Sequence, residues 1–268
     1  MKTTGFVLMM LIDSHCHLDD DRFDADRDRV IERARQSGVC GFIVPATTAN
    51  RWDKVRQVVE SCDGAFAAYG LHPMFLGQHQ APHLRELDEW LDREQPVAVG
   101  ECGLDYYQSR RDEKWQRQLF TEQLQLAINH RLPVIVHVRK AMDEVIGLLR
   151  RNCPSRGGVI HSFAGSRQQA GQLLDLGFRL GIAATVGFER AKKLRAVVAG
   201  IDSEALLLES DAPDQPGQAH RGERNEPAFV VEHFDAIARL REMSPPELAA
   251  ILYRNSCELF SLEDSGNR

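Results

Sequence analysis

The chain has 268 residues, and its 33 Lys and Arg against 39 Asp and Glu give a formal net charge of −6. Hydrophobic residues make up 43% and charged residues 27%, which is the balance of an ordinary soluble globular protein. No apolar run approaches the roughly 20 residues that span a bilayer, which excludes a transmembrane protein. The acidic total argues against a protein that coats DNA through charge alone.

Cysteine usage and the chain ends indicate a cytoplasmic protein of one domain. The six cysteines are scattered with no CxxC pair, as is typical of reduced thiols. Residues 1–10, MKTTGFVLMM, lack a cleavage site of small residues, so we interpret them as an N-terminal extension, or the product of an upstream start codon, that leads into a buried strand. No linker or low-complexity tract follows, and residues 265–268 are expected to be a frayed tail.

Buried strands and helices alternate along the chain. Aliphatic runs without polar alternation are typical of parallel strands buried on both faces, and they occupy Val7–Ile12, Gly41–Pro45, Ala65–Leu71, Val97–Gly100, Pro133–Val138, Gly158–Ile160, Phe178–Ile182 and Ala205–Leu208. Amphipathic stretches that stop at Gly or Pro predict helices between them, among them Asp24–Gln36, Trp115–His130 and Arg167–Leu176.

The spacing of these strands predicts the fold. Seven strand-to-strand units fill the 196 residues from Asp13 to Glu209, about 28 residues each, whereas a strand with its crossover helix needs about 30 and a (β/α)8 barrel about 250. We therefore predict an α/β fold, a single (β/α)8 TIM barrel over residues 1–268, with a doubly wound open sheet as the alternative. The irregular stretches Gln78–Pro82 and Asp211–Glu223 predict active-site loops.

The strongest local signal is His15-Cys16-His17, at the end of the first strand. Because side chains alternate along a strand, the two imidazoles point the same way and can chelate one metal ion. Taken alone, such a pair is more often incidental than a metal site.

Ionisable residues also end four later strands, and these are Glu101, His137, His161 and Glu209 with Asp211 just beyond it. One polar residue at a strand end needs no special explanation. In a barrel, however, all these ends meet on one rim, where the catalytic residues of the fold lie. Four histidines, a glutamate and an aspartate form a nitrogen and oxygen ligand set that suits Zn²⁺ or Mn²⁺, and also Mg²⁺ or Fe²⁺.

Six ligands are too many for one open tetrahedral site, so we predict two divalent metal ions that share a carboxylate. Glu101 is the natural bridge, with one ion held by His15, His17 and Asp211 and the other by His137 and His161. We assign catalysis to Asp211 and Glu101, with Asp211 orienting the bridging hydroxide and collecting its proton. Glu209 is predicted to lie behind the ligands and fix a histidine tautomer.

Three further residues are candidate substrate contacts. His72 closes the third strand in GLHP, Arg139 lies at the end of the fifth strand, and Arg224 opens the segment RNEP. Each also has a structural interpretation: a packed loop histidine, a surface salt bridge, and a helix start with Asn225 as N-cap and Pro227 in the first turn.

With these residues in place, the chain resembles the TatD family of metal-dependent hydrolases over about residues 11–260, through LIDSHCHLD, YGLHP, GECGLDY, PVIVHVRKAMDE, HSFAGS, ESDAP and RNEP. The resemblance implies a TIM barrel, a divalent-metal site and deoxyribonuclease activity on phosphodiester bonds. Position by position, it assigns metal binding to the same six residues, His15, His17, Glu101, His137, His161 and Asp211. One departure is Ser210, where the family more often has Thr.

We therefore expect a TatD-like deoxyribonuclease that cleaves DNA through a metal-bound hydroxide, with 3′–5′ exonuclease action on single-stranded ends as one form of that activity. Neighbouring phosphates could bind Arg139, Lys140 and Arg110–Arg111, and bases could stack on Phe75, Tyr106, Tyr107 or Phe163. The alternative is a small-molecule amidohydrolase, lactonase or phosphoesterase, although Glu101 stands where an amidohydrolase would carry a bridging Lys. A non-enzymatic metal-binding scaffold would have lost a ligand, whereas all six are present. No membrane or obligate protein partner is expected.

Overall fold

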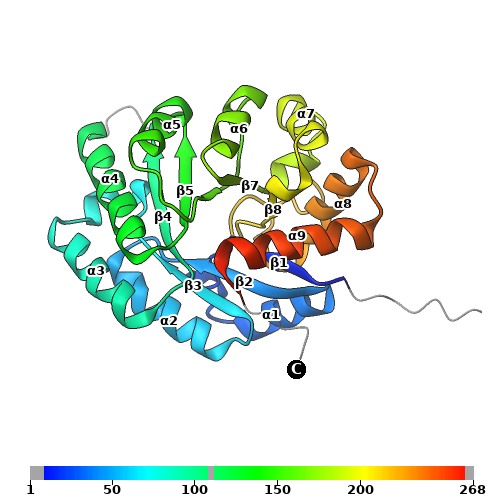
Figure 1. Ribbon diagram of the computed structural model, residues 1–268. Helices are drawn as coiled ribbons and strands as arrows, with labels where there is room; N and C mark the ends of the chain where they lie inside the picture. Colours follow the sequence, from blue (N-terminus) through cyan, green and yellow to red (C-terminus); the bar gives the residue numbers. More distant parts are fainter. Residues whose placement is uncertain (1–8, 108–111, 263–268) are drawn as a thin grey trace, which may run out of the picture.

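The computed structural model describes residues 9–107 and 112–262. Eight parallel strands follow one another around one sheet in chain order, surrounded by helices (Figure 1). The strands are β1 (Leu11–Asp13), β2 (Val39–Pro45), β3 (Ala65–Tyr69), β4 (Ala98–Asp105), β5 (Val134–Arg139), β6 (Gly158–Ile160), β7 (Phe178–Ile182) and β8 (Leu206–Leu208). The predicted (β/α)8 barrel is confirmed, and the open doubly wound sheet is wrong because the strand order never reverses.

The helices pack outside the strands, and these are α1 (Arg27–Gln36), α2 (Trp52–Ser61), α3 (Pro82–Glu94), α4 (Glu113–His130), α5 (Met142–Arg151), α6 (Arg167–Leu174), α7 (Lys192–Gly200), α8 (Val230–Arg241) and α9 (Pro245–Phe260). The three predicted helices recur, each with one end as predicted and the other shifted by two or three residues. For example, α4 begins before Trp115 because the Asp112 side chain accepts the Trp115 backbone N–H at 2.9 Å. None of the helices in the described ranges is long and apolar enough to cross a membrane.

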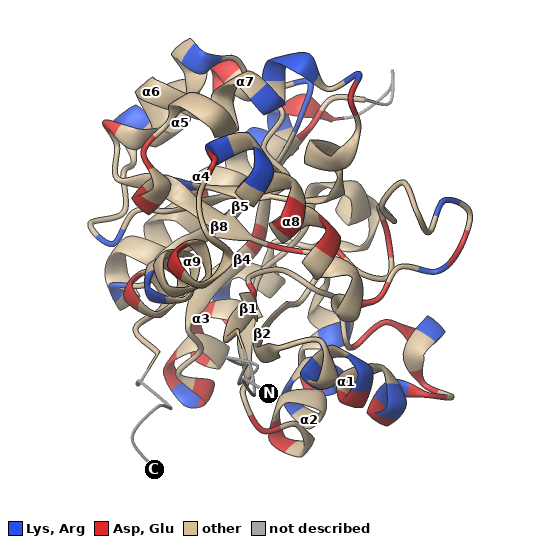
Figure 2. Cartoon of the chain, turned by 90° about the vertical axis from the view of Figure 1, so that its right-hand side faces the viewer, with Lys and Arg blue, Asp and Glu red and all other residues tan. Residues whose placement is uncertain are grey.

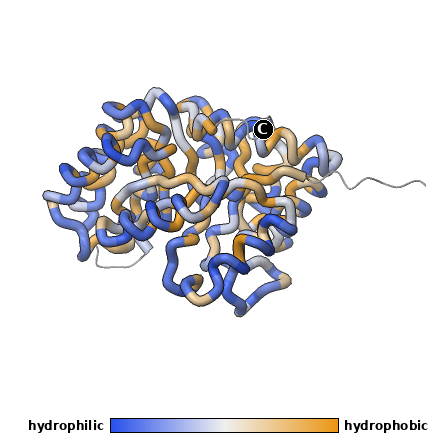
Figure 3. The backbone as a smooth tube through the Cα atoms, turned by 90° about the horizontal axis from the view of Figure 1, so that it is seen from below, coloured by the Kyte–Doolittle hydropathy of each residue, from blue (hydrophilic) through white to orange (hydrophobic). Residues whose placement is uncertain are grey.

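The barrel interior is filled by one apolar residue from each of seven strands. This layer consists of Ile12, Ile43, Ala68, Ala98, Ile135, Val159 and Leu207. Leu259 and Phe260 from the end of α9 belong to the same cluster, so α9 covers the end of the barrel at which this apolar layer lies. Figure 3 shows hydrophobic segments through the middle of the molecule and hydrophilic ones at its periphery, and Figure 2 shows acidic and basic residues interspersed over the helices.

The predicted ends of β4 and β5 are wrong, since β4 runs on to Asp105 and β5 to Arg139. The register between the two strands shifts by one residue, from Val99 opposite Val134 to Cys102 opposite Val136. Because side chains alternate along a strand, this shift turns Glu101 and Asp105 toward the barrel interior. Beyond the shift, β4 continues to pair with β5. This close pairing requires a glycine at position 103, because a Cβ on Gly103 would lie 2.0 Å from the carbonyl oxygen of His137.

The first strand and the last meet through polar contacts. Ser14 N donates to the Leu208 carbonyl at 2.9 Å. The Ser210 backbone N–H and hydroxyl donate to the two Asp13 carboxylate oxygens at 2.9 and 2.6 Å. Of the predicted first strand, Met9 and Met10 lie before β1, and residues 7–8 lie outside the described part of the chain, as does the predicted frayed tail. All six cysteines are free thiols.

Candidate metal centre

His15 and His17 follow β1 directly and point into the same space, as their spacing predicts. Their Nε2 atoms lie 3.3 Å apart. His17 Nδ1 donates to the Pro45 carbonyl at 3.1 Å, which leaves the Nε2 lone pair facing the cluster. This fixed tautomer is the form in which an imidazole binds a metal ion.

Asp211 comes back to the same point from the loop after β8. Its backbone N–H donates to the His15 carbonyl at 2.9 Å, and it holds a left-handed φ of 58°, a conformation that aspartate tolerates better than most residues. Asp211 Oδ1 lies 3.7 Å from the Nε2 atoms of both His15 and His17, and 3.5 Å from His161 Nε2. Gln215 donates to the other carboxylate oxygen.

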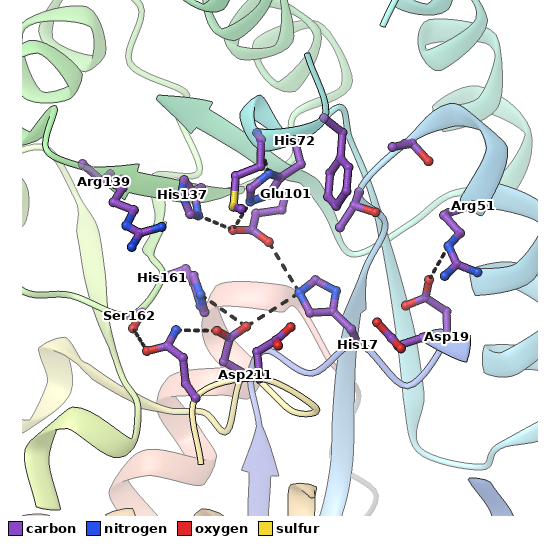
Figure 4. A pocket seen from close by; sticks show the side chains of 18 of the residues that line it. His17, Asp19, Arg51, His72, Glu101, His137, Arg139, His161, Ser162 and Asp211 are labelled. Carbon is purple, nitrogen blue, oxygen red and sulfur yellow. Dashed lines mark hydrogen bonds and ion pairs between the residues drawn. The ribbon is translucent and has the colours of Figure 1, made fainter. Parts of the chain in front are cut away.

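Glu101 lies in the centre of the cluster, and its two oxygens face different histidines (Figure 4). Its Oε2 lies 3.2 Å from His15 Nε2 and 3.7 Å from His17 Nε2. Its Oε1 lies 3.1 Å from His72 Nε2 and 3.0 Å from His137 Nδ1. Glu101 thus lies between two groups of histidines, His15 with His17 on one side and His72 with His137 on the other.

Two carboxylates lie behind the histidines. Glu209 Oε1 is 3.0 Å from His161 Nδ1, which is the position predicted for it. Gly181 leaves the room it needs, because a Cβ there would meet Glu209 Oε2 at 2.2 Å. Asp105 plays the matching part for His137, with Oδ2 3.3 Å from Nε2.

Electrostatics keep the central carboxylates charged. Burial alone would raise the pKa of Glu101, but His72, His15 and His137 hold it well below its usual range. Burial acts in the same sense on Asp211, and His161 with its neighbours reverses the effect, so its pKa is lowered too. The ionised pair is therefore available to cations.

The donor set fits divalent metal ions. Within residues 9–107 and 112–262, three groups have ligand atoms within 4.8 Å of one another: His15, His17 and Asp211; His72, Glu101 and His137; and His15, Glu101 and His161. The first is the predicted group. The second places His72, which we had assigned to substrate, beside His137 and Glu101, and the third places His161 with His15 and Glu101. Buried imidazole and carboxylate atoms that converge in this way are the ligands chosen by Zn²⁺, Mn²⁺ and Mg²⁺.

A cavity of about 920 Å³ opens above this cluster. Among the candidate substrate contacts, His72 and Arg139 line it. Arg224 does not, and instead donates to both Asp26 carboxylate oxygens at 2.8 Å.

The aromatic candidates divide in the same way. Phe75 lines the cavity and Tyr107 is 53% exposed, whereas Phe163 is buried and Tyr106 packs against the core, so these two are not exposed stacking surfaces. Arg110 and Arg111 lie outside the described residues. The predicted Gln78–Pro82 loop contributes Gln78 to the lining, and the Asp211–Glu223 loop contributes Asp211, Asp214 and Gln215.

Asn225 is not the N-cap of a helix, contrary to the prediction. A short 3-10 turn at Pro227–Phe229 precedes α8, and Glu226 is its first flanking residue. The buried Asn225 amide instead donates to the carbonyls of Ser210 and Asp214 at 2.8 and 2.7 Å. Asn225 thus holds the loop that carries Asp211.

Sequence reasoning missed the roles of two buried carboxylates. Asp105 follows Glu101 at an even spacing in GECGLD, so a longer strand would have placed both on one face. Asp13 accepts hydrogen bonds from Ser210 and, at 3.3 Å, from the His15 backbone N–H. Burial raises the pKa of Asp13 to about 7, although these hydrogen bonds lower it in part.

An eight-stranded parallel barrel with a histidine and carboxylate cluster at the carboxyl ends of its strands defines a class of metal-dependent hydrolases. The sequence profile described as TatD related DNase matches residues 12–261. The chain belongs to this family.

Relatives across the whole length agree with this assignment. The Escherichia coli K12 protein named uncharacterized metal-dependent hydrolase YjjV is 38% identical, over 96% of this chain and 100% of its own. Its crystal structure superposes with a TM-score of 0.93 over the same shares. The Bacillus subtilis hydrolase YabD is 34% identical, over 94% of this chain and 100% of its own. An E. coli phosphotriesterase homology protein shares the fold, with a TM-score of 0.65 at 15% identity over 94% and 99% of the two chains.

Proposed function

We propose that this TatD-family hydrolase is a deoxyribonuclease that cleaves phosphodiester bonds of single-stranded DNA with two divalent metal ions, Zn²⁺, Mn²⁺ or Mg²⁺. The observation that carries the proposal is the placement of Glu101, whose Oε1 and Oε2 face separate histidine groups at 3.0–3.2 Å. Bridging carboxylates of this kind are characteristic of two-metal phosphodiester hydrolysis. The free thiols fit a cytoplasmic enzyme.

Bound ions would lower the pKa of a water molecule and neutralise charge on a phosphoryl oxygen. The protein's own residues would hold these ions and orient the groups that bind them. His15, His17 and Asp211 would hold one ion, and His72 and His137 the other, with Glu101 between them. Glu209 keeps His161 oriented from behind through Nδ1.

Asp211 is the group placed to manage the proton of the attacking water. Its Oδ1 faces three imidazole Nε2 atoms at 3.5–3.7 Å, at the floor of the cavity. Because its pKa is lowered, it is ionised when substrate arrives and accepts a hydrogen bond from the water that it orients. The same carboxylate takes the proton at an oxygen as the new P–O bond forms, and returns it to the leaving oxygen as the scissile P–O bond breaks.

The test is hydrolysis of end-labelled single-stranded DNA by metal-stripped protein supplied with Mg²⁺, Mn²⁺ or Zn²⁺. Wild type and His15→Ala are compared, with His83→Ala on α3, outside the cluster, as the matched control. A lactone, an N-acyl substrate and a small phosphodiester are assayed in parallel. We expect metal-dependent DNA cleavage by wild type and His83→Ala but not by His15→Ala. Equal cleavage by all three, or turnover of the lactone or amide with DNA left intact, would overturn the proposal.

A further inference from the structure

Apart from the histidines, three described cations line the cavity, and two of them are already paired with carboxylates. Arg22 lies 2.8 Å from Asp214, and Arg51 lies 2.6 Å from Asp21. For Arg139, no described carboxylate oxygen lies within 4.0 Å. Of these three arginines, Arg139 is therefore the one whose positive charge is free to bind a phosphate that enters the cavity.

Arg139 belongs to a small cluster with Tyr107 and Lys140, which we call the cation–tyrosine cluster. The Arg139 guanidinium carbon lies 3.6 Å from the centre of the Tyr107 ring, and Lys140 Nζ lies 4.9 Å from it. The negative face of the ring holds the two cations near each other despite their repulsion. All three side chains are exposed, so the cluster offers two positive charges and an aromatic surface to a ligand.

The cation–tyrosine cluster is fixed relative to the metal centre through one carboxylate. Asp105 Oδ1 accepts the Tyr107 backbone N–H at 2.9 Å, and Oδ2 lies 3.3 Å from His137 Nε2. The Tyr106 N–H also donates to the Arg139 carbonyl at 2.8 Å. Arg139 itself is two residues past His137 on β5, about 7 Å further toward solvent. The cation–tyrosine cluster thus lies on the solvent side of His137, a candidate metal ligand.

Elsewhere in the cavity lining, the carboxylates of Asp19, Asp20, Asp21 and Asp214 are paired with Arg22 and Arg51, so four negative charges stand against two positive ones. Figure 4 shows Arg139 and Asp19 on opposite sides of the Glu101 and His17 cluster. A polyanion is therefore attracted more strongly to Arg139, which has no described carboxylate partner, than to the aspartates near Asp19, whose arginine partners are already neutralised.

We infer that the DNA strand leaves the cavity over the ends of β4 and β5, where Arg139 and Lys140 bind the phosphate next to the scissile one and the Tyr107 ring carries a base. This inference rests on the proposed deoxyribonuclease function. Stacking on an aromatic ring beside cations is the common means of holding single strands without sequence preference.

The experiment measures KM and kcat for a short oligothymidylate, together with its binding by fluorescence anisotropy in EDTA. The variants are the double substitution Arg139→Gln with Lys140→Gln, Tyr107→Ala, and Tyr107→Phe, which keeps the ring. Arg150→Gln is the matched control, because it removes an exposed positive charge at the far end of α5.

We expect KM to rise about tenfold in the double variant and at least fivefold in Tyr107→Ala, with kcat changed much less. Tyr107→Phe restores the wild-type KM. The dependence of log KM on log salt falls by about 0.7 for each cation removed, whereas Arg150→Gln leaves it unchanged.

The outcomes separate the two proposals. If wild type cleaves DNA and the double variant keeps its KM, affinity and salt dependence, the strand does not use the cation–tyrosine cluster and the inference is wrong. If wild type neither binds nor cleaves DNA, the proposed function fails and the inference falls with it. A Tyr107→Phe variant as impaired as Tyr107→Ala would also contradict a stacking role.

Discussion

Glu101 connects both sides of the histidine cluster, because its two carboxylate oxygens face different imidazoles. It is 2% exposed, and the surrounding histidines keep it ionised. A neutral amide of the same shape would fill the space but lose the negative charge that cations require.

We therefore predict that Glu101→Gln lowers the rate of phosphodiester hydrolysis at least about 100-fold, the upper end of the loss seen when a ligand's supporting partner is removed. Metal content measured by mass spectrometry should fall in parallel. Glu89→Gln, at an exposed position on α3, is the control and should behave as wild type. A Glu101→Gln protein with full metal content and full rate would remove Glu101 from the site.

His233 on α8 provides a pH prediction outside the ligand set. It is 1% exposed, and burial lowers its pKa from 6.5 to about 4, although its Nδ1 donates to the Glu209 carbonyl at 3.0 Å. The folded protein thus binds fewer protons here than the unfolded chain. The stabilising contribution is complete above pH 6.5 and is lost as the pH falls toward 4.

The free energy of unfolding of metal-free protein should therefore fall between pH 6.5 and 4, by about 3 kcal/mol from this residue. Urea denaturation across that range measures it. In His233→Asn, whose amide can keep the hydrogen bond to Glu209 but cannot titrate, this part of the fall should disappear. An unchanged pH dependence in the variant would assign the effect to other groups.

At the scale of the element, β4 shows what sequence patterning can and cannot predict. The apolar run Val97–Gly100 correctly predicted a buried strand that leads to Glu101. It could not predict the one-residue register shift against β5 or the four residues that follow Glu101, since these depend on pairing with a distant segment. Asp105 was missed for this reason.

The loop after β8 is a second example. A sequence of Asn, Glu and Pro is typical of a helix start, and it suggested Asn225 as an N-cap. The structure uses the same side chain to satisfy two carbonyls of the Asp211 loop, which only tertiary packing could reveal. The ends of strands and the residue types at them were predictable, but the partners of buried polar groups were not.

Removing that amide takes the donor from the buried Ser210 carbonyl and from the part-buried Asp214 carbonyl. We predict that Asn225→Ala lowers the free energy of unfolding by about 2–4 kcal/mol, and weakens metal binding because Asp211 loses its support. Urea denaturation and metal titration measure the two effects. Asn129→Ala, at an exposed position on α4, should change stability by less than about 0.5 kcal/mol. If Asn225→Ala unfolds with the wild-type midpoint and slope, the loop is held by other contacts.

For the whole molecule, the barrel explains how residues from Asp13 to Asp211 form one site. Eight parallel strands in chain order bring all carboxyl ends to one rim. The 28-residue strand spacing was enough to predict this, and hence to predict that the ionisable residues at five strand ends would converge. It did not predict that His72, which approaches from its own loop, also lies beside Glu101 and His137. The overall charge of −6 likewise could not predict the exposed cation–tyrosine cluster beside the cavity.

The central claim is that two metal ions act together on a phosphodiester at this rim. The most direct test is a titration of metal-stripped protein with Mn²⁺, in which bound ions and the rate of DNA hydrolysis are measured at each equivalent. We predict two ions per chain and a rate that rises steeply only as the second one binds. A full rate without added metal, or saturation at one ion with no further binding, would contradict the claim.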